Sequence, residues 1–224
     1  MIDMIFYINL PKRKDRRIFM EKNLQRLGLP YQRFSAVCPS SHDLLHGKYK
    51  SIYERHEHYP NFQRTTEQLA GEFGCYISHL EVHKLAKELK YDRYLIMEDD
   101  CVVFPWSLKM ISKYLNSEKI PNDWDLLRSC RGSTKIVDKI EEYGQMVNGK
   151  YETNLRSNGT HFTMVNGKNV DVIINYIENS TVRAIDAVYS TPKLNVYGSK
   201  FKVKLSDRKL RYKSDICKIQ EMSE

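Results

Sequence analysis

The sequence predicts an α/β protein in which a mixed, mainly parallel sheet carries helices on both faces. Three observations predict this class. Short apolar runs of strand length alternate with helical patterns along most of the chain. One of these runs ends directly in three acidic residues, which is typical of the carboxyl edge of such a sheet. The chain of 224 residues is 41% hydrophobic and 29% charged, so it can bury a single large core.

The first part of the chain shows strands and helices separated by turn signals. The expected elements are a strand over 4–10, a helix over 14–27, a strand over 31–37, a long loop over 38–68 and a helix over 71–90. The first helix presents Ile18, Leu24 and Leu27 as its apolar positions, and Gly28 is a suitable stop signal. The long loop is polar and has little periodicity, and we expect it to cross the edge of the sheet.

The second part of the chain repeats the alternation. The expected elements are a strand over 93–97, a helix over 106–115, a strand over 124–127, a strand over 160–165 and a helix over 168–178. Residues 132–158 are polar and carry no clear pattern, and residues 194–224 begin as a strand and then become loose and basic.

Charge and cysteine content restrict the cellular setting. The net charge of +8 suits an anionic partner, and the five cysteines are spread out without a C-x-x-C pair. That spacing argues against a disulfide framework and against a zinc site, and it favours a reducing compartment. No run approaches the roughly 20 apolar residues of a membrane span, and the first residues read as a strand instead of a leader. We therefore expect a cytoplasmic protein.

The acidic triplet Glu98-Asp99-Asp100 follows the apolar run 94–97. Adjacent carboxylates repel one another, and a hard divalent cation such as Mn²⁺ or Mg²⁺ resolves that repulsion. Side chains one residue apart on an extended edge face the same way, so Glu98 and Asp100 form the predicted metal-binding pair. Asp99 then points in the opposite direction. The alternative is a solvated turn that only happens to be acidic.

Four segments in the correct order closely resemble glycosyltransferase family 25, which includes lipooligosaccharide galactosyltransferases and collagen-modifying enzymes. The segments are Ile8-Asn9-Leu10-Pro11-Lys12-Arg13-Lys14-Asp15-Arg16-Arg17, Gly71-Glu72-Phe73-Gly74-Cys75-Tyr76-Ile77-Ser78-His79, Leu95-Ile96-Met97-Glu98-Asp99-Asp100 and Gly159-Thr160-His161-Phe162. The resemblance implies a GT-A type fold with a Rossmann-like sheet and a nucleotide-sugar donor. It also implies a catalytic domain over 1–193, followed by a basic segment over 194–224.

The resemblance assigns expected roles to particular residues. Asp100 is the first choice for direct metal contact, with Glu98 as its partner, while Asp99 faces the ribose or the sugar. The expected nucleotide-side residues are Asn9, Arg13, Arg16, Glu72, Ser78 and His79. For Ser78 and His79 the alternatives are holding the acidic loop or a purely structural position. Cys75 is expected to be a buried structural cysteine, because no base for a nucleophile is evident.

Two residues in the second half complete the predicted site. His161 is a third metal ligand, an acceptor contact or a structural imidazole. Asp186 lies among apolar residues, and burial would raise its pKa and suit it to act as the general base for an acceptor hydroxyl. Arg183 and Ala184 stand where the family pattern has a proline, so a structural role for Asp186 remains the alternative.

The expected activity is metal-dependent, inverting transfer of a hexose, galactose first, from a UDP-sugar to a lipooligosaccharide-type acceptor. There are three alternatives: a UDP-glucose enzyme, a metal-dependent phosphohydrolase, and a non-catalytic module that binds anionic glycan or nucleic acid. The last of these would show steep salt dependence and indifference to the acidic triplet. The basic C-terminal segment suits peripheral contact with an anionic membrane or a solvated tail, and no nucleic-acid partner is expected.

Overall fold

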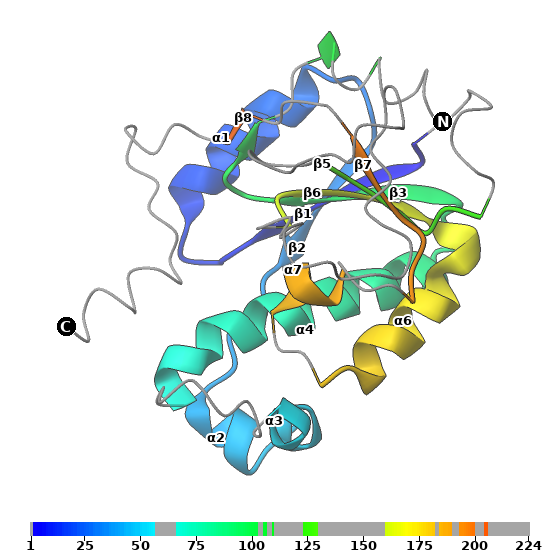
Figure 1. Cartoon of the computed structure of the whole chain (residues 1–224). Coiled ribbons are helices and arrows are strands. Elements are labelled where there is room, and N and C mark those ends of the chain that lie inside the picture. Colours follow the sequence, from blue (N-terminus) through cyan, green and yellow to red (C-terminus); the bar gives the residue numbers. More distant parts are fainter. Residues whose placement is uncertain are drawn as a thin grey trace.

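A mixed sheet lies at the centre of the structure (Figure 1). The structure is a computed structural model that describes residues 2–56, 66–102, 105–106, 109, 123–129, 160–181, 184–189, 193–199 and 204–205. The strand order in the described sheet is β2-β1-β3-β6-β5-β7. The strands are β1 (Met4–Asn9), β2 (Tyr31–Ser35), β3 (Arg93–Glu98), β5 (Leu126–Ser129), β6 (Phe162–Asn166) and β7 (Val196–Ser199).

The sheet is mainly parallel, as predicted. Strand β1 pairs in parallel with β2 and β3, and β5 pairs in parallel with β7. Strand β6 runs antiparallel to both of its neighbours, β3 and β5. The register places Ile8 opposite Glu98, so the carboxyl ends of β1 and β3 lie together at one edge.

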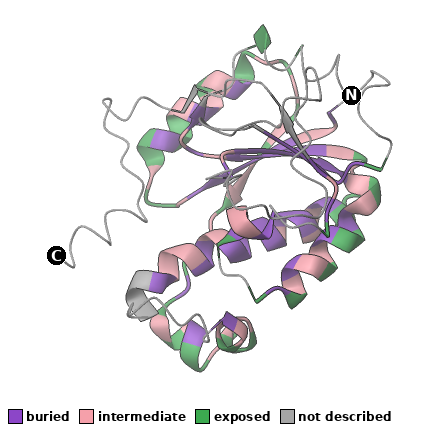
Figure 2. Ribbon diagram, viewed as in Figure 1, coloured by how far each residue is buried: buried purple, intermediate pink, exposed green. Residues whose placement is uncertain are grey.

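Helices cover both faces of the sheet, which confirms the predicted fold class (Figure 1). Helix α1 (Lys14–Gln25) lies on one face, and helices α4 (Thr66–Glu88) and α6 (Val170–Asn179) lie on the other. Alternate strand side chains explain this division, because successive residues of a strand point to opposite faces. Ile5 and Tyr7 pack in the cluster that contains α1 residues, whereas Phe6 packs in the cluster of α4 and α6. Strands β1, β3 and β6 are accordingly buried on both faces, whereas the edge strand β2 is partly exposed (Figure 2).

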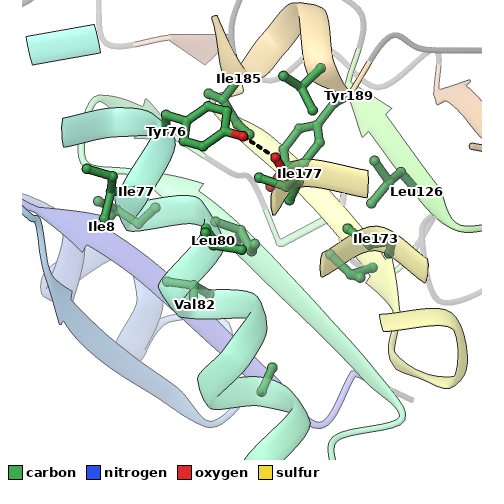
Figure 3. Packing of buried hydrophobic residues seen from close by; sticks show 14 of the residues in the cluster. Ile8, Tyr76, Ile77, Leu80, Val82, Leu126, Ile173, Ile177, Ile185 and Tyr189 are labelled. Carbon is green, nitrogen blue, oxygen red and sulfur yellow. Dashed lines mark hydrogen bonds between the residues drawn. The ribbon is translucent and has the colours of Figure 1, made fainter. Parts of the chain in front are cut away.

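The larger core joins α4 to α6 (Figure 3). Leu80 of α4 and Ile173 of α6 are buried there, and the Tyr76 hydroxyl donates a hydrogen bond to the Ile177 carbonyl. A short 3-10 helix, Gly167–Asn169, precedes α6. Gly167 is required at this bend, because an added Cβ would lie 1.9 Å from the Tyr91 carbonyl oxygen. The close approach fixes the start of α6 against the beginning of β3.

The prediction of a loop over 38–68 is wrong for two segments, which form helices α2 (Ser41–Leu45) and α3 (Lys50–His56). A capping box starts α2: the Ser40 hydroxyl accepts from the Asp43 backbone N–H at 3.1 Å, and the Ser40 N–H donates to Asp43 Oδ2 at 2.9 Å. These helices are too short for hydrophobic periodicity to show. Helix α4 also begins at Thr66, ahead of the predicted residue 71.

Helix α1 has the predicted extent but buries a different face. Ile18, expected in the core, is 67% exposed, and the buried residues are Arg16, Met20 and Leu24. Their spacing of four residues places them on one side of the helix. Gly28 follows the helix with a φ of +65°, in the left-handed region that its stop-signal role requires.

The sheet continues beyond the expected boundary at residue 193, because Val196–Ser199 forms its edge strand β7. A separate pair joins β4 (Cys101–Val102) to β8 (Lys204–Leu205). Most of the predicted helix over 106–115, all of 132–158 and most of the basic segment after 199 lie outside the described residues. Within the described part, no helix combines the length and the apolar character that crossing a membrane requires.

Candidate functional site

The candidate site lies at the carboxyl ends of β1 and β3. Asn9 is the last residue of β1, Glu98 is the last residue of β3, and Asp99 and Asp100 form the turn that follows. In open α/β sheets this edge is the usual place for ligand binding. The antiparallel strand β6 brings His161 to the same edge, because the Glu98 N–H donates to the His161 carbonyl at 3.2 Å.

Glu98, Asp100 and His161 form a compact cluster. The distance from His161 Nδ1 is 2.8 Å to Glu98 Oε2 and 3.0 Å to Asp100 Oδ1. One ligand atom from each residue lies within 4.8 Å of the others. The structure thus brings the predicted metal pair together with the predicted third ligand.

The charges in this cluster stabilise one another. Burial alone would raise the pKa of Glu98, but the charge and hydrogen bond of His161, together with His79, hold this pKa well below its usual range. Burial would lower the pKa of His161, yet Glu98 and Asp100 raise it to about 10. Without a cation, His161 is therefore the positive partner of the two carboxylates.

The Asp99 side chain points away from this cluster and forms a buried ion pair with Arg16. Arg16 Nη1 lies 2.7 Å from Asp99 Oδ1, and Asn9 Nδ2 donates to Asp99 Oδ2 at 2.8 Å. Burial raises the pKa of Asp99 despite the opposing effect of Arg16. Asn9 and Arg16, expected on the nucleotide side, thus contact the acidic turn. Arg13 donates two hydrogen bonds to Asp15, at 3.0 and 2.8 Å.

The segment over 71–79, which contains two glycines, forms part of α4 and packs tightly against the chain after β2. Ser78 Oγ donates to the Gly74 carbonyl at 2.6 Å and accepts from the Val37 N–H at 2.8 Å. An added Cβ at Gly74 would lie 2.5 Å from the Val37 carbonyl oxygen, so this glycine permits a close approach of the two backbones. Ser78 therefore has structural partners. Glu72 is partly buried on α4 and belongs to neither ligand cluster among the described residues.

His79 belongs to a buried chain of polar side chains. The Tyr189 hydroxyl lies 3.1 Å from His79 Nδ1 and 2.6 Å from His83 Nε2, and His83 Nδ1 lies 2.6 Å from the Tyr94 hydroxyl. His79 Nε2 in turn lies 3.7 Å from Glu98 Oε1. The core thus continues into the site through these side chains.

His83 should make the protein less stable in mild acid. Burial lowers its pKa to about 3, whereas an unfolded histidine titrates near 6.5. Between these values the unfolded chain binds a proton that the folded chain does not. The free energy of unfolding should therefore fall by up to about 1.4 kcal/mol per pH unit as pH decreases below 6.5. Urea unfolding between pH 6.5 and about 5 measures this slope above the titration of ordinary carboxyl groups.

The matched variants for this prediction are His83→Gln and His42→Gln. His83→Gln should flatten the slope, and His42→Gln should retain it because His42 is exposed. An unchanged slope in His83→Gln would contradict the assignment.

Asp186 lies on the short helix α7 (Ile185–Val188), which is followed by Tyr189, the residue that contacts His79 and His83. Its Oδ1 accepts from the Ala187 N–H at 2.9 Å, and its carbonyl accepts from Arg128 Nη1 at 3.1 Å. Burial raises the pKa of the Cys75 thiol, and the charges of Glu98, Asp186 and Asp100 add to this effect. The charge of Asp186 therefore acts on the same thiol as the charges of Glu98 and Asp100.

Three residues of the site were given no role in the predictions from the sequence. Thr160 donates to Glu98 Oε1, Tyr189 contacts both α4 histidines, and buried Arg128 packs with its guanidinium 5.8 Å from the Tyr189 ring centre. The spacing of His79 and His83 by four residues on one helix is a sequence signal for a shared partner. Nothing in the local pattern around Arg128 or Tyr189 indicates their contacts.

Comparison with known proteins agrees with the order of the motifs. A family model described as glycosyltransferase family 25 (LPS biosynthesis protein) matches residues 2–191. A glycosyltransferase 25 family member of Drosophila melanogaster is 28% identical over 67% of this chain and 25% of its own length. Procollagen galactosyltransferase 2 of Mus musculus is 26% identical over 65% of this chain and 23% of its own length.

A solved structure of a glycosyltransferase involved in glycosylation of the major capsid of PBCV-1 aligns with a TM-score of 0.40 and 9% identity. The alignment covers 80% of this chain and 69% of that one. The chain spans only about a quarter of the length of the two curated relatives named above. The family match itself extends from β1 to the end of α7, and it includes all four motifs and Asp186. This chain therefore belongs to glycosyltransferase family 25.

Proposed function

We propose that this chain is a metal-dependent, inverting glycosyltransferase that moves galactose from UDP-galactose to a sugar hydroxyl of a lipooligosaccharide-type acceptor. The observation that carries the proposal is the cluster of Glu98, Asp100 and His161 at the carboxyl edge of the sheet. The family assignment supports the transferase class. The names of relatives that are galactosyltransferases support the sugar, and the family description supports the acceptor class.

The donor atoms of this cluster fit a divalent cation such as Mn²⁺ or Mg²⁺. Two carboxylate oxygens and one imidazole nitrogen lie close enough to share one ion. When bound, the ion supplies positive charge that stabilises a departing diphosphate. Glu98, Asp100 and His161 hold it, and His161 must give up its proton to do so.

The remaining residues of the proposed mechanism orient groups and move a proton. Asp186 accepts the proton of the acceptor hydroxyl as that oxygen attacks the sugar, and Arg128 fixes its backbone. Asp99 assists by holding the acidic turn in place through Arg16 and Asn9. A single base is sufficient for an inverting displacement, because no covalent intermediate forms.

The donor nucleotide is proposed to bind beside the start of α1, where the planar fork of Arg13, which donates to Asp15 in this structure, would turn to the diphosphate. On α4, His79 faces the Glu98 carboxylate and Ser78 holds the chain after β2. We also propose that the basic C-terminal segment contacts an anionic membrane peripherally, at its cytoplasmic face. The segment carries many of the lysines and arginines that give the chain its charge of +8.

Thermal unfolding with a panel of UDP-sugars tests the donor and the metal together. We expect UDP-galactose with Mn²⁺ to raise the midpoint of the wild-type chain, because a ligand that binds only the folded state stabilises it. The rise should require the metal and be lost in Asp100→Ala. It should persist in Asp171→Ala, a matched change at an exposed aspartate of α6. A response to UDP-glucose alone would reassign the donor, and no response to any UDP-sugar would contradict the proposal.

Transfer assays then test the acceptor. Labelled galactose should pass to a lipooligosaccharide acceptor lacking its terminal galactose, and not to a collagen-type peptide. The reverse preference would assign the acceptor named for the procollagen galactosyltransferases. Release of free galactose with every acceptor would show hydrolysis without transfer.

A further inference from the structure

A second group of ligand atoms lies on the other side of Glu98. Cys75 Sγ lies 3.9 Å from Glu98 Oε1, and His79 Nε2 lies 3.7 Å from the same oxygen. The other carboxylate oxygen, Oε2, faces His161. The ligand atoms of Cys75, His79 and Glu98 all lie within 4.8 Å of one another. Glu98 therefore stands between two separate sets of potential ligands.

His79 Nε2 is a buried nitrogen without a hydrogen-bond partner among the described residues. The side chain is 0% exposed, and its distance of 3.7 Å to Glu98 Oε1 is too long for a hydrogen bond. Nearly all buried polar atoms in proteins have a partner, so this nitrogen requires an explanation. Its other ring nitrogen, Nδ1, is held by the Tyr189 hydroxyl, which leaves Nε2 directed at the carboxylate.

The distances of two of these groups from Glu98 Oε1 come within a few tenths of an ångström of tetrahedral coordination. Zinc bonds of about 2.3 Å to sulfur and about 2.0 Å to nitrogen or oxygen place neighbouring ligand atoms about 3.3 to 3.5 Å apart. The observed separations from Glu98 Oε1 are 3.9 and 3.7 Å, which a shift of a few tenths of an ångström would close. Cys75 and His79 are one turn apart on α4, so a rigid helix presents both to the same point.

We propose that Cys75, His79 and Glu98 form a binding site for a borderline-soft divalent cation, with Zn²⁺ as the expected occupant. A thiolate and an imidazole favour zinc over Mg²⁺ or Mn²⁺, which prefer oxygen ligands. The proposal concerns metal binding and does not require transferase activity, although Glu98 and His79 also have parts in the proposed function. The cysteine spacing argues against zinc held by cysteine pairs, whereas this site needs only one thiol.

Cation binding here releases one proton and breaks two hydrogen bonds to Glu98 Oε1, one from the Cys75 thiol and one from the Thr160 hydroxyl. The Cys75 thiol releases its proton to solvent as the sulfur–metal bond forms. The Thr160 hydroxyl, which donates to Glu98 Oε1, turns away from that oxygen. Because Oε2 remains available to the cluster of His161 and Asp100, the Glu98 carboxylate can bridge two cations of different chemical character.

Cobalt(II) is the probe for this site, because a cobalt–thiolate bond gives an ultraviolet charge-transfer band. The full chain is used with Cys38, Cys130 and Cys217 replaced by serine, which leaves Cys75 and Cys101 as the only thiols. We expect the band on addition of Co²⁺, and its loss when Zn²⁺ is added. Cys75→Ser should abolish the band. His79→Gln should weaken Zn²⁺ binding at least about 10-fold, since loss of even an outer partner of a ligand costs about 10- to 100-fold.

Controls separate this result from unfolding and from other thiols. Far-ultraviolet circular dichroism and the thermal midpoint without metal establish that each variant is folded. X-ray absorption of the zinc-loaded wild-type chain needs no variant, and it should show one sulfur at about 2.3 Å from the metal. The proposal is overturned by a spectrum with nitrogen and oxygen neighbours only, or by a cobalt–thiolate band that persists in folded Cys75→Ser.

Discussion

Glu98→Gln should reduce galactosyl transfer from UDP-galactose at least about 10³-fold, because charge stabilisation by a bound metal contributes several kcal/mol to a transition state. The substitution keeps the shape of the side chain, removes its charge and replaces one acceptor oxygen by an NH₂ group. Glu98 contacts His161 through one oxygen and faces Cys75 and His79 through the other, so its charge acts on both groups of ligands. Initial rates at saturating Mn²⁺ measure the effect.

A matched control is Glu178→Gln, which neutralises an exposed glutamate of α6 that pairs with Lys84. It should leave transfer unchanged. A second readout follows from the charges in the cluster: Glu98 raises the pKa of His161, so the histidine should titrate at lower pH in Glu98→Gln. NMR titration of the His161 ring measures this shift. Full activity in Glu98→Gln would show that the cluster is not the site of metal-assisted transfer.

The central sheet could be predicted because its inner strands β1, β3 and β6 are buried on both faces. Such strands are continuous apolar runs, and the run 94–97 reveals both a strand and the edge at which its acids emerge. The shared facing of Glu98 and Asp100 is predicted from extended backbone, whereas Asp99 and Asp100 form a turn, and contact with His161 brings the two carboxylates together. His161 directly precedes β6, and the pairing of β6 with β3 brings this histidine beside the two carboxylates.

The contacts that hold the site could not be predicted from local patterns. Arg16 occupies a core-facing position of α1 because a carboxylate 83 residues away neutralises it, and Ile18 is displaced to the surface as a result. Tyr189 and Arg128 likewise act through partners that are distant in the chain. Helices α2 and α3 are short, and only the capping box at Ser40 marks the first of them. Contacts between polar groups that are far apart in the chain leave no periodic pattern in the local sequence.

Arg16→Met should destabilise the folded protein by about 3 to 5 kcal/mol, because removing one partner of a buried ion pair leaves an uncompensated charge. The side chains of Arg16 and Asp99 are 6% and 9% exposed, and their closest atoms are 2.7 Å apart. Methionine keeps much of the apolar stem, so lost packing contributes little. Urea unfolding at neutral pH measures the loss, and Arg17→Met on the exposed side of the same helix is the matched control.

The double variant Arg16→Met with Asp99→Asn separates this role from a contact with nucleotide. Asparagine can still accept the hydrogen bond from Asn9 and carries no charge, so the double variant should recover much of the stability lost in Arg16→Met. If Arg16 acts only by holding the acidic turn, the double variant should also recover binding of UDP-galactose. Recovery of stability without recovery of binding would instead place the Arg16 guanidinium on the donor diphosphate. A single variant as stable as the wild type would contradict the buried pair as a source of stability, and would leave Asn9 as the group that orients Asp99.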